Sequence, residues 1–191
     1  QMGGPSAAAL APPAAAGAPI RVEGSLKATP AQAEFLKQHQ SAARAAEAQT
    51  GIPATFMVAQ AAHESGWGQR EIRNADGTSS FNLFGIKADA HWKGPVAEIT
   101  TTEVIGGVAR KVVAKFRAYA SYAESFGDYA RMMKTSPRYS SVIGQVQGRT
   151  GSAQEFAQGL QRAGYATDPA YADKLTRVIN TTLRLQQRGV A

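Results

Sequence analysis

The chain has 191 residues, enough for one well-buried domain plus a tail, and 43% of them are hydrophobic. It contains no cysteine, which excludes disulfides, thiolate metal sites and thiol nucleophiles, and it lacks the run of roughly 18 apolar residues that a membrane span requires. The net charge of +7 favours polyanionic neighbours such as nucleic acid, anionic lipid or an acidic cell-wall polymer, without choosing among them.

The N-terminal stretch is dominated by alanine, proline and glycine, with almost no large apolar side chain. Such a stretch cannot bury enough surface to offset the entropy of ordering it. We therefore expect a flexible linker over residues 1–28, followed by one domain over residues 29–191; a short strand at residues 20–22 is the alternative. Because no signal-peptide pattern opens the chain, we expect it to be a segment of a longer protein.

Two helices are predicted after the linker. Thr29, Pro30 and Gln32 are typical of a helix N-terminus with a capping box, and Gly51 can end that helix. A second helix begins near Pro53 and runs through "ATFMVAQAAHES", after which two glycines stop it.

The middle of the chain favours β structure. The segments "FNLFGIK" at 81–87 and "VAEITTTEVIGGVARKVVAKFRAY" at 96–119 are rich in valine, isoleucine, threonine and phenylalanine. Gly106 and Gly107 divide the longer segment into two halves, which predicts a β hairpin.

Helical patterns then return towards the C-terminus. The pairs Ser121 with Glu124 and Ser152 with Glu155 have capping-box spacing. The last helix follows an Asp-Pro pair, and one of its faces carries Tyr171, Leu175, Val178 and Thr182. The order predicts an α+β fold, mainly α, in which a small β lobe projects from the helices.

Glu64 stands at the end of the second helix, directly before "SGWG". On a helical wheel it shares a face with Met57, Gln60 and Ala61, so its neighbours are small or apolar. Burial and the negative end of the helix dipole both disfavour the charged carboxylate, which predicts a raised pKa. A carboxylic acid that stays protonated near neutral pH can donate a proton to a leaving-group oxygen. The alternative is an ordinary solvated glutamate.

Trp67 and Trp92 offer flat apolar faces of the kind on which sugars stack, although two tryptophans in such a chain can equally be core residues. A zinc-protease site is excluded because Trp67 occupies the second histidine position of "HESGW". The three histidines show no ligand spacing, and no serine lies in a nucleophile-elbow context. We expect neither a metal nor a cofactor.

Five motifs, "AAHESGWGQ", "FNLFGIKA", "WKGPVAEITTTE", "KFRAYASYAESFGDY" and "AGYATDPAYADKL", occur in this order over roughly residues 30–188. With them the chain resembles the glucosaminidase domain of glycoside hydrolase family 73, and the flagellar members of that family most closely. The resemblance implies a lysozyme-like fold with a cleft between an α lobe and a β lobe. It also implies endo-β-N-acetylglucosaminidase activity, which cleaves the β-1,4 bond between N-acetylglucosamine and N-acetylmuramic acid in peptidoglycan.

The resemblance also implies roles for individual residues. Glu64 matches the general acid, Glu103 a second acidic residue in the β lobe, and Tyr165 a tyrosine that lines the cleft, and these three are the candidate catalytic residues. The candidate sugar contacts are Trp67, Asn82, Phe84 and Trp92.

Strand geometry bears on the second carboxylate. Glu98 and Glu103 differ by an odd number and therefore point to opposite faces of a strand, so at most one should face the cleft unless a bulge intervenes. The resemblance favours Glu103, and Glu98 is the alternative. Retaining, inverting and substrate-assisted mechanisms all remain open, because sequence gives no distance between carboxyls.

The expected partners are peptidoglycan glycan strands and, through a further N-terminal domain, flagellar rod or hook proteins. The expected location is the periplasm at the flagellar base. A lytic transglycosylase and a non-catalytic peptidoglycan-binding module are the alternatives. Nucleic-acid binding is not expected, since only the charge favours it and no recognition motif is present.

Overall fold

The computed structural model describes residues 27–149 and 152–189, and the structural statements that follow concern these residues. The predicted linker lies almost entirely outside them, so it stays a prediction. The helices are α1 (Pro30–Thr50), α2 (Ala54–Ser65), α3 (Tyr122–Thr135), α4 (Ser140–Val146), α5 (Ala153–Arg162) and α6 (Tyr171–Gln187). The strands are β1 (Val96–Ile105) and β2 (Val108–Arg117).

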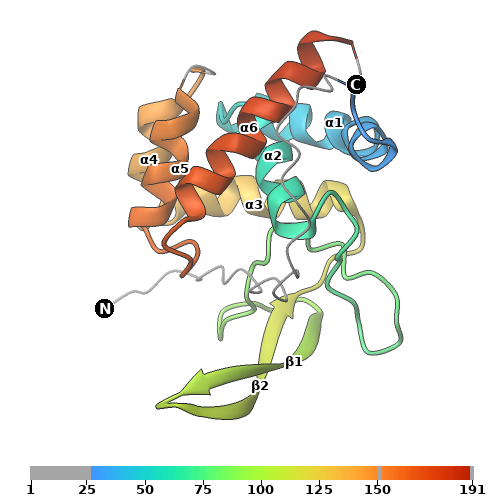
Figure 1. The fold of residues 1–191 in the computed structure, drawn as a ribbon, viewed down its shortest axis with the longest axis vertical. Coiled ribbons are helices and arrows are strands. Elements are labelled where there is room, and N and C mark those ends of the chain that lie inside the picture. The colour runs from blue at the N-terminus through green and yellow to red at the C-terminus, as the bar shows by residue number, and fades with distance from the viewer. Residues whose placement is uncertain (1–26, 150–151, 190–191) are drawn as a thin grey trace.

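The helices form one body, and the two strands form a hairpin that projects from one end of it (Figure 1). Within the body, α2 packs against α1 and α6, while α1 also packs against α3 and α5 against α6. The α+β prediction with a projecting β lobe is confirmed. No helix in the described ranges is both long enough and apolar enough to cross a membrane.

The start of α1 follows its sequence signature. The Thr29 hydroxyl accepts a hydrogen bond from the Gln32 backbone N–H, and the Gln32 side chain accepts one from the Thr29 N–H, both at 3.1 Å. This reciprocal pair satisfies two N–H groups that a helix start leaves without partners. At the far end, Gly51 adopts a left-handed conformation with φ 76°, as the predicted terminating glycine should.

Helix α2 is the central helix of the body. Its residues from Phe56 to Ala62 are all buried, because neighbouring helices cover it on most sides. Gly66 ends it in a left-handed conformation with φ 58° and donates its N–H to the Ala62 carbonyl. The following residue, Trp67, is also left-handed, with φ 56°. The chain therefore turns sharply away from α2 directly after Glu64.

The hairpin pairs β1 with β2 in continuous antiparallel register from Val96 opposite Arg117 to Ile105 opposite Val108. Gly106 and Gly107 form the turn, with φ 58° and 81°, a conformation that glycine adopts without strain. The predicted hairpin is thus confirmed, and no bulge interrupts it. A short bridge between Lys87 and Phe116 adds a third strand-like segment at the base of the hairpin.

The two predicted capping boxes behave differently. The Ser121 hydroxyl accepts the Glu124 backbone N–H at 3.1 Å, so the cap of α3 is confirmed. The Glu124 carboxylate accepts the Ala120 N–H, one residue before the expected donor. The prediction for Ser152 is wrong: its backbone does not have the extended geometry of a capping residue, and its hydroxyl makes no cap hydrogen bond.

Candidate active site

Glu64 lies in the last turn of α2, at the edge of a small pocket. The pocket is lined by residues of α2 and of two loops that follow it, namely Glu64, Ser65, Arg70, Ile72, Asn82, Leu83 and Gly85. Its volume is about 10 Å³, roughly the space for one water molecule. The Glu64 side chain is half-buried, and the pocket beside it has little room for water.

Burial raises the pKa of the Glu64 carboxyl to about 8, because an ionised carboxylate loses hydration there. Two smaller influences lower the pKa: a hydrogen bond from the Tyr171 hydroxyl and the positive charge of Arg70. The direction agrees with the prediction from the helical wheel. At pH 7 most of the population carries a proton on Glu64 and can act as a general acid.

Arg70 is held beside Glu64 by the backbone turn after α2. Its guanidinium lies directly over Gly66, where any Cβ would come within 2.8 Å of the Arg70 Nε. The Arg70 N–H also donates to the Ser65 carbonyl at 2.8 Å. Gly66 thus has two functions. It reverses the chain after α2, and it leaves room for the Arg70 guanidinium next to the Glu64 carboxyl. Arg70 lies six residues after Glu64, and no motif in the sequence marks it as a site residue.

A cluster of buried tyrosines lies behind Glu64. The Tyr171 hydroxyl donates to Oε1 of Glu64 at 3.2 Å. Tyr165 stacks on Tyr171 with ring centres 5.9 Å apart, and its own hydroxyl donates to the Phe84 carbonyl at 2.6 Å. Because Tyr165 is fully buried and its proton is already engaged, the structure places it as a support of the pocket wall. Its catalytic role stays a prediction.

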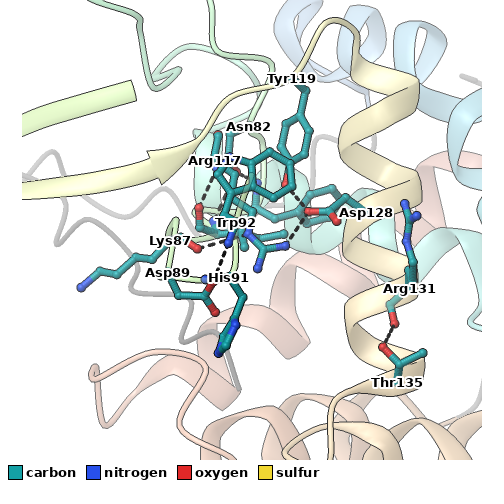
Figure 2. A network of polar contacts seen from close by, with 12 residues as sticks. Asn82, Lys87, Asp89, His91, Trp92, Arg117, Tyr119, Asp128, Arg131 and Thr135 are labelled. Carbon is teal, nitrogen blue, oxygen red and sulfur yellow. Dashed lines mark hydrogen bonds and ion pairs between the residues drawn. The ribbon is translucent and has the colours of Figure 1, made fainter. Parts of the chain in front are cut away.

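Two of the predicted sugar contacts, Trp67 and Trp92, are tryptophans at the surface of the domain. Trp67 is half-buried and packs edge-on against Phe35 at 5.8 Å. Trp92 is also half-buried; its indole N–H donates to the Pro95 carbonyl at 2.7 Å, and the Arg117 guanidinium lies over its ring at 4.8 Å (Figure 2). Both rings keep some exposed surface, so contact with sugars stays a prediction for each.

Phe84 and Asn82 have structural positions that the sequence did not reveal. Phe84 is 0% exposed and stacks on Tyr129 with ring centres 4.0 Å apart, so its ring has no surface to offer a sugar. The Asn82 amide donates to the Ile86 and Arg117 carbonyls at 2.9 and 2.8 Å and accepts the N–H groups of Phe84 and Ile86 at 3.2 Å. With all these bonds made internally, Asn82 fixes the loop that forms the pocket wall.

Two glutamates of the hairpin, Glu98 and Glu103, lie on β1. Glu98 is exposed and forms an ion pair with Lys115 at 3.8 Å on the opposite strand. The backbone of Glu103 pairs with Arg110, and the unbroken register gives position 103 the parity of Ala97 and Ile99. The Glu103 side chain lies outside the described part of the structure. Its assignment as the second carboxylate therefore stays a prediction.

A polar network joins the hairpin to the helical body. Arg117, the last residue of β2, forms an ion pair with Asp128 of α3 at 3.0 Å, and the Tyr119 hydroxyl donates to the same carboxylate oxygen at 2.5 Å (Figure 2). Both ion-pair side chains are largely buried. The network anchors the base of the hairpin next to the loop that carries Trp92.

Two larger hollows, of about 390 and 340 Å³, lie between α5 and α6 and beside α1 and α2. The titratable side chains that line them are exposed, except Glu47, which is half-buried. In the described ranges, no three histidine, aspartate or glutamate residues gather closely enough to hold a metal ion. We take Glu64, whose pKa is raised by burial, as the centre of the candidate site.

Known proteins resemble this chain over most of its length. Residues 40–184 match the family model described as mannosyl-glycoprotein endo-beta-N-acetylglucosaminidase. The chain is 53% identical over 145 residues to the peptidoglycan hydrolase FlgJ of Escherichia coli K12, covering 76% of this chain and 45% of that protein. It is 34% identical over 125 residues to the exo-glucosaminidase LytG of Bacillus subtilis 168, covering 65% and 42%. The chain thus spans about half the length of the curated relatives it matches.

Solved structures give the same result. A peptidoglycan hydrolase from Sphingomonas sp. A1 superposes with a TM-score of 0.70 at 46% identity, covering 83% of this chain and 95% of that one. The glycoside hydrolase domain of FlgJ from Salmonella typhimurium superposes with a TM-score of 0.65 at 45% identity, covering 82% and 91%. The fold class predicted from the motifs is confirmed. The chain belongs to the glucosaminidase family.

Proposed function

We propose that this chain is a peptidoglycan hydrolase that acts as an endo-β-N-acetylglucosaminidase. The observation that carries the proposal is a carboxyl whose pKa is raised to about 8 at the edge of a pocket, on a chain of the glucosaminidase family. The relatives named above are peptidoglycan hydrolases and a glucosaminidase, which supports the substrate. The bond cleaved is the β-1,4 link between N-acetylglucosamine and N-acetylmuramic acid.

In the proposed mechanism, Glu64 donates its proton to the glycosidic oxygen as the bond to the sugar breaks. A positive charge then develops on the sugar ring, and a second group must stabilise or attack it. Glu103 of the hairpin is our candidate, acting as nucleophile, as base for a water, or as partner of the substrate's own N-acetyl group. In each version the acid is indispensable and the second carboxylate contributes less.

We further propose that the activity serves assembly of the flagellar rod through the cell wall, in the periplasm at the flagellar base. The resemblance of five motifs to flagellar members of the family supports this setting. We propose that contacts with rod or hook proteins are made through a further N-terminal domain, and not through the domain described above. The net charge of +7 suits an anionic wall polymer.

The test is clearing of purified cell walls by the wild type and by Glu64→Gln, with the new ends identified by mass spectrometry. Hydrolysis leaves N-acetylglucosamine at the reducing end, and the variant should be inactive. An anhydro sugar would instead identify a lytic transglycosylase. Wall binding without any cleavage by the wild type would identify a binding module and overturn the proposal.

A further inference from the structure

A line of hydrogen bonds runs through the core to Glu64 and joins three helices. The Tyr129 hydroxyl of α3 donates to Oε1 of Gln60 in α2. The Gln60 amide nitrogen donates to the Tyr171 hydroxyl of α6 at 3.0 Å, and that hydroxyl donates to Oε1 of Glu64 at 3.2 Å. We call Tyr129, Gln60 and Tyr171 the donor chain. Each of its donors points towards the carboxyl.

The donor chain is isolated from solvent. Its three residues are each 0% exposed, so water does not compete for their hydrogen bonds. Gln60 lies one helical turn before Glu64 on the same face of α2. The Tyr171 ring is held between Tyr165, which stacks on it, and His63, which meets it edge-on at 5.4 Å. The hydroxyl of Tyr171 is therefore fixed between one donor and one acceptor.

The orientation of the Gln60 amide sets the direction of the whole chain. The amide oxygen can only accept a hydrogen bond and the amide nitrogen can only donate. With the oxygen towards Tyr129, the nitrogen occupies a lone pair of Tyr171 and leaves the Tyr171 proton for Glu64. In the reverse orientation Tyr171 would donate to Gln60 and present only lone pairs to Glu64. The observed orientation therefore makes Oε1 of Glu64 an acceptor.

We propose that the donor chain positions the acid proton: it keeps Oε1 of Glu64 an acceptor, so that Oε2 carries the proton delivered to the glycosidic oxygen. This inference rests on the proposed hydrolase function. Among the described residues, no hydrogen bond reaches Oε2. When the proton is transferred, the O–H bond at Oε2 breaks and a new one forms on the leaving oxygen. The electron pair left behind spreads over the carboxylate, whose Oε1 keeps the Tyr171 hydrogen bond.

The donor chain thereby acts more strongly on the ionised product form of Glu64 than on the acid form, since hydrogen bonds to a charged acceptor are stronger. The groups that face or surround the carboxyl are Arg70 from the loop after α2, Tyr171 from α6, Tyr165 from the loop before α6 and Tyr129 from α3. His63 is flanked by Lys174 and Asp168. Of these groups, the Tyr171 hydroxyl alone donates to the carboxyl among the described residues.

The experiment compares Tyr171→Phe and Tyr129→Phe with the wild type. The pKa of Glu64 is followed by carbon NMR of labelled glutamate carboxyls, assigned with Glu64→Gln, and the pH dependence of kcat is measured on soluble glycan fragments. Tyr171→Phe should raise the pKa and move the alkaline limb up by about one pH unit, because a hydrogen bond to the carboxylate is lost. It should lower kcat more than it changes KM. Tyr129→Phe should act in the same direction and more weakly.

Tyr165→Phe is the matched control for the pKa. It removes an equally buried hydroxyl, but one that donates to the Phe84 carbonyl, so the Glu64 pKa should stay in place. Equal pKa values in Tyr171→Phe and Tyr165→Phe would overturn the inference and reduce the donor chain to a structural role. Where Tyr171→Phe folds poorly, an unchanged pKa in Tyr129→Phe overturns it too. The NMR titration needs no turnover, so it separates this inference from the proposed function.

Discussion

From Phe56 to Ala62, α2 is buried without interruption, whereas the outer part of the hairpin exposes large apolar side chains such as Val104, which is 73% exposed. The helical body holds one continuous core, and the hairpin base holds a small cluster of Ile72, Ala97, Phe116 and Ala118. Both regions carry an acidic residue of the family motifs. In the body, burial changes the chemistry of the Glu64 carboxyl by raising its pKa.

This contrast suggests a division of labour. The acid needs a rigid, dry setting that holds its proton, and α2 provides it. In the proposed mechanism, the second carboxylate, for which Glu103 is our candidate, must stay charged near the developing positive charge on the sugar. The ion pair of Arg117 with Asp128 joins the base of the hairpin to α3, whereas the apolar side chains near its tip are exposed.

The largest expected effect separates the two carboxylates. Glu64→Gln should lower kcat by about 10²–10⁴-fold, the usual contribution of a general acid, and Glu103→Gln should lower it by less than about 10²-fold. The measurement is release of reducing ends from purified walls at pH 6. Equal losses from the two substitutions would contradict the division of labour.

The stability of the junction between the helical body and the hairpin should depend on the buried ion pair of Arg117 with Asp128. Asp128→Ala leaves the Arg117 guanidinium without its carboxylate at a largely buried position and should lower the free energy of unfolding by about 3–5 kcal/mol. Lys115→Ala removes a partner of an ion pair whose side chains are 62% and 61% exposed, and should cost at most about 1 kcal/mol. Urea unfolding followed by circular dichroism measures both. A loss for Lys115→Ala as large as that for Asp128→Ala would refute the distinction.

Removing the buried carboxyl should stabilise the body at high pH. The folded-state pKa of Glu64, about 8, lies above its ordinary value of 4.5, so the wild type loses stability as the pH rises from about 4.5 to 8. Glu64→Gln has no such loss. Its unfolding free energy should equal that of the wild type at pH 4 and exceed it by about 2–4 kcal/mol at pH 9. Thermal unfolding at the two pH values checks this, and a constant difference would show that burial does not hold the proton.

The smallest effect should come from the tip of the hairpin. Val104→Thr should leave the free energy of unfolding within about 0.5 kcal/mol of the wild type, since the side chain is already exposed to water. Val58→Thr in α2, where the side chain is 1% exposed, should cost about 1–3 kcal/mol for the buried hydroxyl. Similar costs at both positions would mean that a further contact covers the tip.

Local signals in the sequence predicted local structure well. The capping box of α1, the glycines after α2 and the Gly106–Gly107 turn each act over a few residues, and the structure contains all three. The raised pKa of Glu64 was also predictable, because a helical wheel shows its small and apolar neighbours. Ser152 failed because a capping box requires an extended backbone, which spacing alone does not reveal.

Long-range contacts could not be predicted from the sequence. Tyr171 reads as one residue of an apolar helix face, and nothing near it indicates that its hydroxyl meets a carboxyl 107 positions away. Phe84 and Asn82 belong to a family motif, yet burial, which the motif does not encode, decides that they support the site from within. Whether a bulge interrupts β1 between Glu98 and Glu103 could not be predicted either, and the continuous register shows that none does.

The separation of Gln60 and Tyr171 by 111 residues has a consequence for how the protein is made. During synthesis, residue 64 leaves the ribosome long before residue 171. Before the chain folds, we expect Glu64 to be an ordinary hydrated carboxylate that is ionised at neutral pH. A chain interrupted before Tyr171 would contain the whole "AAHESGWGQ" motif and still lack the helix that packs most extensively on α2. The surroundings that raise the pKa of Glu64 are therefore complete only once the last helix packs against α2.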